Sequence, residues 1–197
     1  MDNLLMPAFA EPVHASQQVF RHALKALSEP GLLQNVGDVP GLDCLAPATY
    51  ALCLSLLDSD TTLWLSPSLD TAQVRANLTF HCGCPIVEQP QQAAFAILDG
   101  SRDTDISAFN TGTDRDPHLS CTVLLQLDSL DSGAATLWRG PGILNKRTVR
   151  LPLPPAFWAQ RVQQPFPQGV DMFMTSGSSV MGLPRSTKVS PAIQEVI

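Results

Sequence analysis

Charged side chains are scarce in this sequence of 197 residues: Asp, Glu, Lys and Arg together make up 15% of it, whereas soluble domains average about 25%. So little surface charge is typical of a chain that covers part of its surface with partners, although a surface rich in Ser, Thr, Gln and Pro explains the same composition. No uninterrupted apolar run reaches the roughly 18 residues that a membrane-spanning helix needs. We therefore predict no membrane contact.

The sequence also lacks the basic clusters that nucleic-acid binding requires. Its formal net charge is −6. Residues 1–131 carry 5 basic and 16 acidic side chains, and residues 132–197 carry 7 basic and 2 acidic ones, so their charges are −11 and +5. A chain that is acidic overall is a poor partner for phosphate backbones, and we expect no nucleic acid. The basic C-terminal third predicts docking to an acidic partner or binding of a small anion.

A disulfide framework is not indicated either. The five cysteines are an odd number, and a chain of this length buries roughly 70% of its unfolded surface without cross-links. The run Ala8–Ala10 superficially matches a signal-peptidase site, but no basic segment precedes it and Pro7 interrupts the apolar residues. We predict free thiols and a cytoplasmic protein.

Motifs of catalytic and metal sites are missing as well. There is no P-loop, no nucleophile elbow and no Ser-His-Asp order, so we assign no catalytic residue and leave open whether the chain is an enzyme. The most metal-like cluster is His81–Cys84, but structural zinc sites need two separated ligand pairs. We interpret it as a helix end with buried thiols and predict no bound metal.

The pattern of apolar residues predicts alternating helices and strands. Residues 16–28 favour an amphipathic helix with Phe20, Leu24 and Leu27 on one side, capped by Ser16 and ended by Glu29-Pro30-Gly31. Further helices are expected at 47–57, after a capping Asp70, and at 152–164, and strands at 32–36, 61–65, 93–98, 119–127, 135–138, 170–175 and 180–183. This order predicts an α/β three-layer sandwich with a mixed β-sheet, and a single domain over residues 1–197.

Two stretches near the C-terminus are candidates for anion binding or for structure. Arg139, Gly140 and Gly142 follow an expected strand, where a guanidinium and open backbone N–H groups suit an anion, although Gly-Pro-Gly is also an ordinary tight turn. Arg185 and Lys188 lie beyond the last hairpin, and Lys188 is ordinarily a solvated charge.

The same hairpin places an acidic residue near one of these basic residues. Asp171 lies at the start of its first arm and Arg185 beyond its second arm, so the turn brings the two together. We expect a structural ion pair between them.

Three stretches of this chain resemble one known family. The run Phe20–Gly31, Phe-Arg-x-x-Leu-Lys-Ala-Leu-Ser-Glu-Pro-Gly, and the run Phe166–Lys188, with its Phe-Pro-x-Gly-x-Asp and Pro-Arg-Ser-Thr motifs, are similar to the PhnH family. The Asp-Thr-x-x-Trp-Leu strand at 60–65, between two helices, fits the same pattern. This family supplies the H subunit of the bacterial carbon-phosphorus lyase core complex.

The resemblance implies a fold like the large domain of pyridoxal-phosphate-dependent transferases but without the cofactor site, and hence no cofactor. It implies a homodimer that associates with the G, I and J subunits during phosphonate breakdown. In that family the radical cleavage belongs to a different subunit with an iron-sulfur cluster, and this chain lacks the clustered cysteines that such a cluster needs. We expect an accessory subunit without catalysis of its own. The alternative is an independent enzyme that binds a phosphate, a phosphonate or a nucleotide on the basic C-terminal face.

Overall fold

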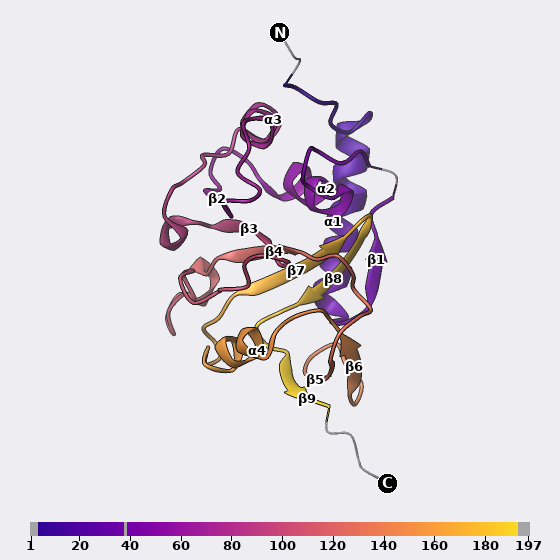
Figure 1. The fold of residues 1–197 in the computed structure, drawn as a ribbon, viewed down its shortest axis with the longest axis vertical. Coiled ribbons are helices and arrows are strands. Elements are labelled where there is room, and N and C mark those ends of the chain that lie inside the picture. Colours follow the sequence, from indigo (N-terminus) through magenta and orange to yellow (C-terminus); the bar gives the residue numbers. More distant parts are fainter. Residues whose placement is uncertain (1–3, 38, 193–197) are drawn as a thin grey trace.

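The computed structural model describes residues 4–37 and 39–192 (Figure 1). The helices are α1 Pro12–Ser28, α2 Pro47–Leu56, α3 Ala72–Cys82 and α4 Pro155–Val162, with short 3₁₀ turns at Pro90–Gln92 and Pro117–Leu119. The strands are β1 Leu33–Asn35, β2 Leu63–Leu65, β3 Phe95–Asp99, β4 Thr122–Gln126, β5 Ala135–Arg139, β6 Arg147–Arg150, β7 Asp171–Ser176, β8 Ser179–Leu183 and β9 Lys188–Pro191.

Six of the strands form one mixed sheet in the order β1-β8-β7-β4-β3-β2. The neighbours from β2 to β7 run parallel, whereas β8 returns antiparallel to β7 through the tight hairpin and β1 lies antiparallel to β8. The strands β6, β5 and β9 form a second, antiparallel sheet. The predicted α/β fold with a mixed sheet is confirmed.

The large sheet is buried on both faces, as parallel strands usually are. Ile97, Leu124 and Phe173 lie side by side on β3, β4 and β7 and face a core built with α1, α2 and α3. Their neighbours along each strand, such as Val123 and Met172, face a second core. Figure 1 shows α4 and the small sheet on that second side. The sheet is therefore the middle one of three layers.

Helix α1 begins earlier than predicted. It starts at Pro12 behind Glu11, and Ser16 lies inside the helix, where its hydroxyl donates to the carbonyl of Pro12. The predicted Ser16 cap is wrong. Pro12 is suited to the first turn because its fixed φ matches the helix and its missing N–H has no partner there anyway.

The apolar side of α1 is also displaced by one residue from the predicted stripe. Phe20 is 45% exposed, Leu24 is 53% exposed and Leu27 is half-buried. The buried residues of the helix are Val19, Ala23 and Ala26.

A close backbone contact explains this displacement. A Cβ atom on Gly182 of β8 would overlap with the carbonyl group of Ala26, so the helix lies directly on the strand. Only small side chains fit between two backbones at that separation, and the larger Phe20 and Leu24 therefore lie on the outer side.

Two further details differ from the sequence-based expectations. The cap of α3 is Thr71, whose hydroxyl accepts the N–H of Val74, whereas the predicted cap, Asp70, pairs with Arg75. Strands β6 and β9 were not predicted, because each contains a single valine among polar residues or proline and therefore no apolar run. In the described part of the chain no helix has the combined length and apolar content for crossing a membrane.

The contact between α1 and β8 predicts a strong effect of one added methyl group. Gly182→Ala should lower the free energy of unfolding by about 3 kcal/mol, because the helix backbone has to move away from the sheet. Chemical denaturation followed by circular dichroism measures this.

The matched control is Gly177→Ala at the tip of the same hairpin, where φ is 53° and an added Cβ meets nothing within 4 Å. It should cost only the left-handed backbone strain, about 1 kcal/mol. Equal losses in both variants would show that the α1–β8 contact does not limit stability.

Candidate functional site

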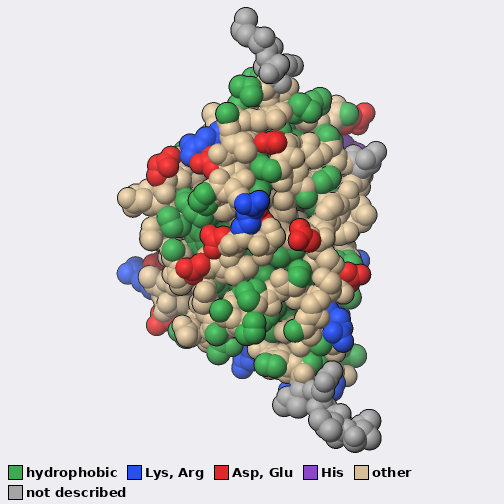
Figure 2. Space-filling view, in the orientation of Figure 1, with side chains coloured by type: hydrophobic (Ala, Val, Ile, Leu, Met, Phe, Trp, Pro, Cys, Tyr) green, Lys and Arg blue, Asp and Glu red, His purple; other side chains and the backbone are tan. Residues whose placement is uncertain are grey.

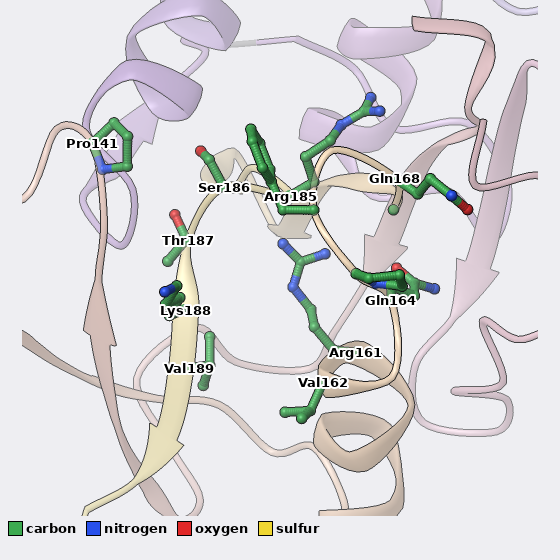
Figure 3. Close-up of a pocket in the computed structure, with 13 residues that line it drawn as sticks. Pro141, Arg161, Val162, Gln164, Gln168, Arg185, Ser186, Thr187, Lys188 and Val189 are labelled. Carbon is green, nitrogen blue, oxygen red and sulfur yellow. The ribbon is translucent and has the colours of Figure 1, made fainter. Parts of the chain in front are cut away.

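A cavity of about 620 Å³ lies at the amino end of β7, between the end of α4, the loop that follows it and the segment 185–189. Figure 3 shows its polar side chains on these three segments. They are Arg161, Gln164, Gln168, Arg185, Ser186, Thr187 and Lys188. The remaining wall consists of Gly169 and of apolar residues, among them Pro165 and the exposed Val162 and Phe166. This volume suits a small-molecule ligand.

Arg161 reaches the cavity because α4 buries its inner side. Phe157, one helical turn earlier, is fully buried and packs edge-on against Trp158. Arg161 is thus drawn into the core and is 7% exposed. Its two terminal nitrogens donate to the carbonyls of Val170 at 2.7 Å and Pro184 at 2.5 Å. Arg161 therefore holds the start of β7 and the end of β8 against α4.

The buried guanidinium of Arg161 has an unusual environment. Burial lowers its pKa to about 10, an effect that nearby Asp171 opposes and Arg185 reinforces. The group still carries its charge at neutral pH. Its Nε, and the hydroxyl of buried Thr187, have no hydrogen-bond partner among the described residues. Such groups are rare in folded proteins and need an explanation.

Arg185 and Asp171 form an ion pair that is mostly shielded from solvent. Arg185 Nη2 lies 2.5 Å and Nε 3.0 Å from Asp171 Oδ2, and the backbone N–H of Arg185 donates to Oδ1 at 2.7 Å. Arg185 also donates to Ser120 Oγ at 2.6 Å and to the carbonyl of Pro117. In Figure 3 its guanidinium points away from Arg161. Arg185 thus lines the cavity mainly with its stem and backbone.

Lys188 and Arg139 lie next to each other on two neighbouring strands of the small sheet. They are directly opposite residues of β9 and β5, and both are exposed. Like charges in such a position repel each other and raise the local positive potential. Lys188 borders the cavity, whereas Arg139 does not.

Gly140 and Gly142, which the sequence offered as anion-binding candidates beside Arg139, lie against protein backbone. A Cβ on Gly142, whose φ is 79°, would overlap with the carbonyl oxygen of Ser28 at the end of α1. A Cβ on Gly140 would lie 3.0 Å from the carbonyl oxygen of Ser186. Only Pro141 of this turn reaches the cavity. The structure brings Arg185 and Lys188 together there, but not Arg139, Gly140 or Gly142.

Beyond the carboxyl ends of the parallel strands, where α/β sheets usually bind ligands, side chains of this chain occupy the space. Gln126 accepts from the N–H of Ala46 at 2.7 Å and from the hydroxyl of Thr49 at 2.9 Å. Thr49 in turn lies 2.6 Å from the hydroxyl of Thr175. These contacts fasten the start of α2 to β4 and β7. The cavity at the opposite end is the better candidate site.

Comparison with known proteins identifies the family. Residues 7–190 match the family described as bacterial phosphonate metabolism protein (PhnH). This chain belongs to the PhnH family.

Two relatives of this PhnH-family chain carry curated names. It is 32% identical over 188 residues to "Alpha-D-ribose 1-methylphosphonate 5-triphosphate synthase subunit PhnH" of Rhizobium meliloti (strain 1021), with 92% of this chain and 94% of the relative covered. It is 27% identical over 183 residues to "Putative C-P lyase subunit protein HtxG" of Stutzerimonas stutzeri, with 88% and 85% covered.

Of the polar residues that line the cavity of this PhnH-family chain, only Arg185 and Lys188 were named as candidates from the sequence, and the most consequential ones that were missed are Arg161 and Thr187. The position of Arg161 carried a usable signal, because it lies four residues after Phe157 on the inner side of α4, where a charged residue is unexpected. Thr187 carried none: only the path of the chain between β8 and β9 buries it.

The cluster at His81–Cys84 has the local structure that was predicted. Helix α3 ends at Cys82, Gly83 adopts a left-handed φ of 71°, and Cys84 is buried. A hydrogen bond with Cys84, together with burial, raises the pKa of Cys82 far above its usual range. Residues 4–37 and 39–192 contain no group of three or more His, Cys, Asp or Glu side chains arranged to hold a metal ion.

The Asp171–Arg185 pair predicts a measurable loss of stability on neutralisation. Asp171→Asn should lower the free energy of unfolding by about 1–3 kcal/mol, because it leaves a shielded guanidinium with weaker acceptors. Thermal and urea unfolding at neutral pH measure the effect.

Asp70→Asn is the matched control, since Asp70 also pairs with an arginine, Arg75, but at a more exposed place. Its loss should stay within about 1 kcal/mol. A smaller effect at Asp171 than at Asp70 would contradict a stabilising role of the shielded pair.

Proposed function

We propose that this chain is an accessory subunit of the bacterial carbon-phosphorus lyase core complex, without catalysis of its own. The observation that carries the proposal is the match to the PhnH family over residues 7–190. The name of the Stutzerimonas relative, which describes a carbon-phosphorus lyase subunit, supports it. The organism would use the complex to obtain phosphorus from organic phosphonates.

The outer side of α1 supports a role in an assembly. Val13, Phe20 and Leu24 are 87%, 45% and 53% exposed and follow one another at spacings of seven and four residues, which places them on one side of the helix. We call them the α1 surface. Rows of exposed apolar side chains commonly mark interaction sites. The sequence has few charged residues, and Figure 2 shows that on the face in view the charged side chains are few and scattered.

Strand β1 extends this side of the molecule. It packs beside α1, and its Leu33 is 51% exposed. Within the described residues its outer edge pairs with no other strand. An unpaired edge strand next to exposed apolar side chains is a place where another chain can add contacts.

The partners in this proposal are a second copy of the chain and the G, I and J subunits. The α1 surface and β1 form one of the contacts, and the basic C-terminal region suits an acidic surface on a larger subunit. The complex works in the cytoplasm, which agrees with five cysteines that are all free thiols. We also propose, from the family resemblance, that the fold of this chain is like the large domain of pyridoxal-phosphate-dependent transferases without the cofactor site.

A second candidate function rests on the cavity beside Arg161. An independent enzyme or binder of phosphate, phosphonate or nucleotide would use this cavity without other subunits. A thermal-shift screen with ATP, ribose 5-phosphate and pyridoxal phosphate examines it, because a ligand stabilises only the folded form that binds it. This candidate also predicts that no stable complex forms.

Co-expression with the G, I and J subunits tests the main proposal. A tagged chain should retain the three subunits through affinity purification and gel filtration in a single peak. The chain alone should elute as a dimer. Purification of the chain without any of the three subunits would contradict the proposal and favour the independent binder.

The α1 surface predicts which variant weakens assembly. The double variant Phe20→Asp/Leu24→Asp should reduce the recovered dimer or complex by about tenfold or more, since apolar anchors dominate interface energies. Gel filtration with light scattering gives the readout, and circular dichroism checks folding.

The matched control is Phe80→Asp/Leu119→Asp, which makes the same two kinds of substitution at side chains that are 67% and 60% exposed and lie outside both the α1 surface and the basic C-terminal region. Assembly should be unchanged. Full assembly of the α1 variant would show that α1 faces solvent in the complex.

A further inference from the structure

The charges around Arg161 do not balance. Among the described residues, Asp171 is the acidic group that acts on Arg161, and it is already paired with Arg185 at 2.5 Å. The three groups together keep one positive charge, and Arg161 holds it in a place that is 7% exposed. A buried charge without an opposite charge is costly. The cavity next to it therefore has a positive potential.

The hydrogen bonds of this cluster are incomplete in the same place. Arginine has five N–H donors, and the two contacts of Arg161 to backbone carbonyls leave its Nε without a partner in the described chain. Thr187, on the neighbouring wall, has a buried hydroxyl without a partner there. In Figure 3 the guanidinium of Arg161 points towards the segment that carries Thr187. Two donors without a partner in the described chain thus belong to two residues that line one cavity from two segments.

We propose that this cavity binds one phosphate or phosphonate group, with Arg161 and Thr187 as donors at its base and Lys188 at its rim. A tetrahedral oxyanion accepts several hydrogen bonds at once and offers the negative charge that this cluster lacks. The guanidinium of Arg185 already donates to the carboxylate of Asp171 and to the carbonyl of Pro117, so it stays with Asp171 and helps to position the segment 185–188.

The wall of the cavity indicates an organic ligand and a small movement on binding. Pro165, Phe166 and Val162 lie beside the polar residues and suit the organic part of a phosphonate or a phosphate ester. Arg161 Nε and Thr187 Oγ1 have almost no accessible surface themselves. Binding of an oxyanion to them therefore requires side chains of the wall to move, and exposed side chains such as Phe166 change rotamer on short timescales.

This inference does not depend on the role as a lyase subunit. The cavity consists of residues of this chain alone, so the purified full chain should bind the anion whether or not it assembles with other proteins. Failure of binding and failure of complex formation are separate results from separate experiments.

Direct titration of the purified chain with methylphosphonate, inorganic phosphate and ribose 5-phosphate, at low and constant ionic strength, tests the proposal. Phosphorus NMR linewidths and calorimetry report binding, and sodium chloride at equal ionic strength controls for screening. Saturable binding of at least one of the three probes at millimolar concentration is expected. If none of them binds saturably, the proposal is overturned.

A pair of charge variants locates the site. Lys188→Ala and Arg139→Ala each remove one positive charge from opposite positions of β9 and β5, but only Lys188 lines the cavity. Lys188→Ala should weaken binding about tenfold, the effect of losing a charge-assisted contact, and Arg139→Ala by at most about twofold. Equal weakening would show that the anion senses only the general charge of this face.

Two variants at the base of the cavity complete the test. Arg161→Gln should abolish binding, but it also removes the contacts to Val170 and Pro184 and can impair folding. Thr187→Val keeps the side-chain shape and loses a hydroxyl without a partner in the described chain, so the fold should persist. It should weaken binding several-fold. Unchanged affinity of a folded Thr187→Val protein would remove Thr187 from the site and overturn the proposal as stated.

Discussion

The backbone contact between α1 and β8 determines much of this structure. Because Gly182 has no side chain, the helix backbone at Ala26 lies directly on the strand, and the buried residues of the helix are a valine and two alanines, Val19, Ala23 and Ala26. The larger Phe20 and Leu24 then remain outside. The close packing that stabilises the sheet therefore also creates the exposed apolar row that we propose as an assembly surface.

The same hairpin organises the cavity at its other end. Its first arm begins at Asp171 and its second arm ends just before Pro184, and α4 joins the two ends through Arg161. The carboxylate of Asp171 is paired with Arg185. The positive charge of Arg161 therefore has no acidic side chain of its own in the described chain. One arrangement thus fixes the hairpin and produces a positive cavity beside it.

The proposed surface and the proposed anion site lie on different elements, so the two functions are compatible. The first is formed by α1 and β1, and the second by α4 and the segment that leads into β9. Figure 1 shows these pairs of elements at separate places in the molecule. A subunit with this arrangement can contact a partner through α1 while the cavity stays open to a small anion.

The sequence by itself determined the class of the fold, most of its helices and strands, and the family. Periodic apolar residues and Pro or Gly stops are local features, and the motifs from Phe20 to Gly31 and from Phe166 to Lys188 are continuous in the chain. Only the tertiary structure decided which side of α1 is buried, because that depends on a glycine more than 150 residues away, Gly182. It also decided that Arg161 and Thr187 border one cavity and that Arg139 lies outside it. These relations arise from packing between distant segments, which no local pattern records.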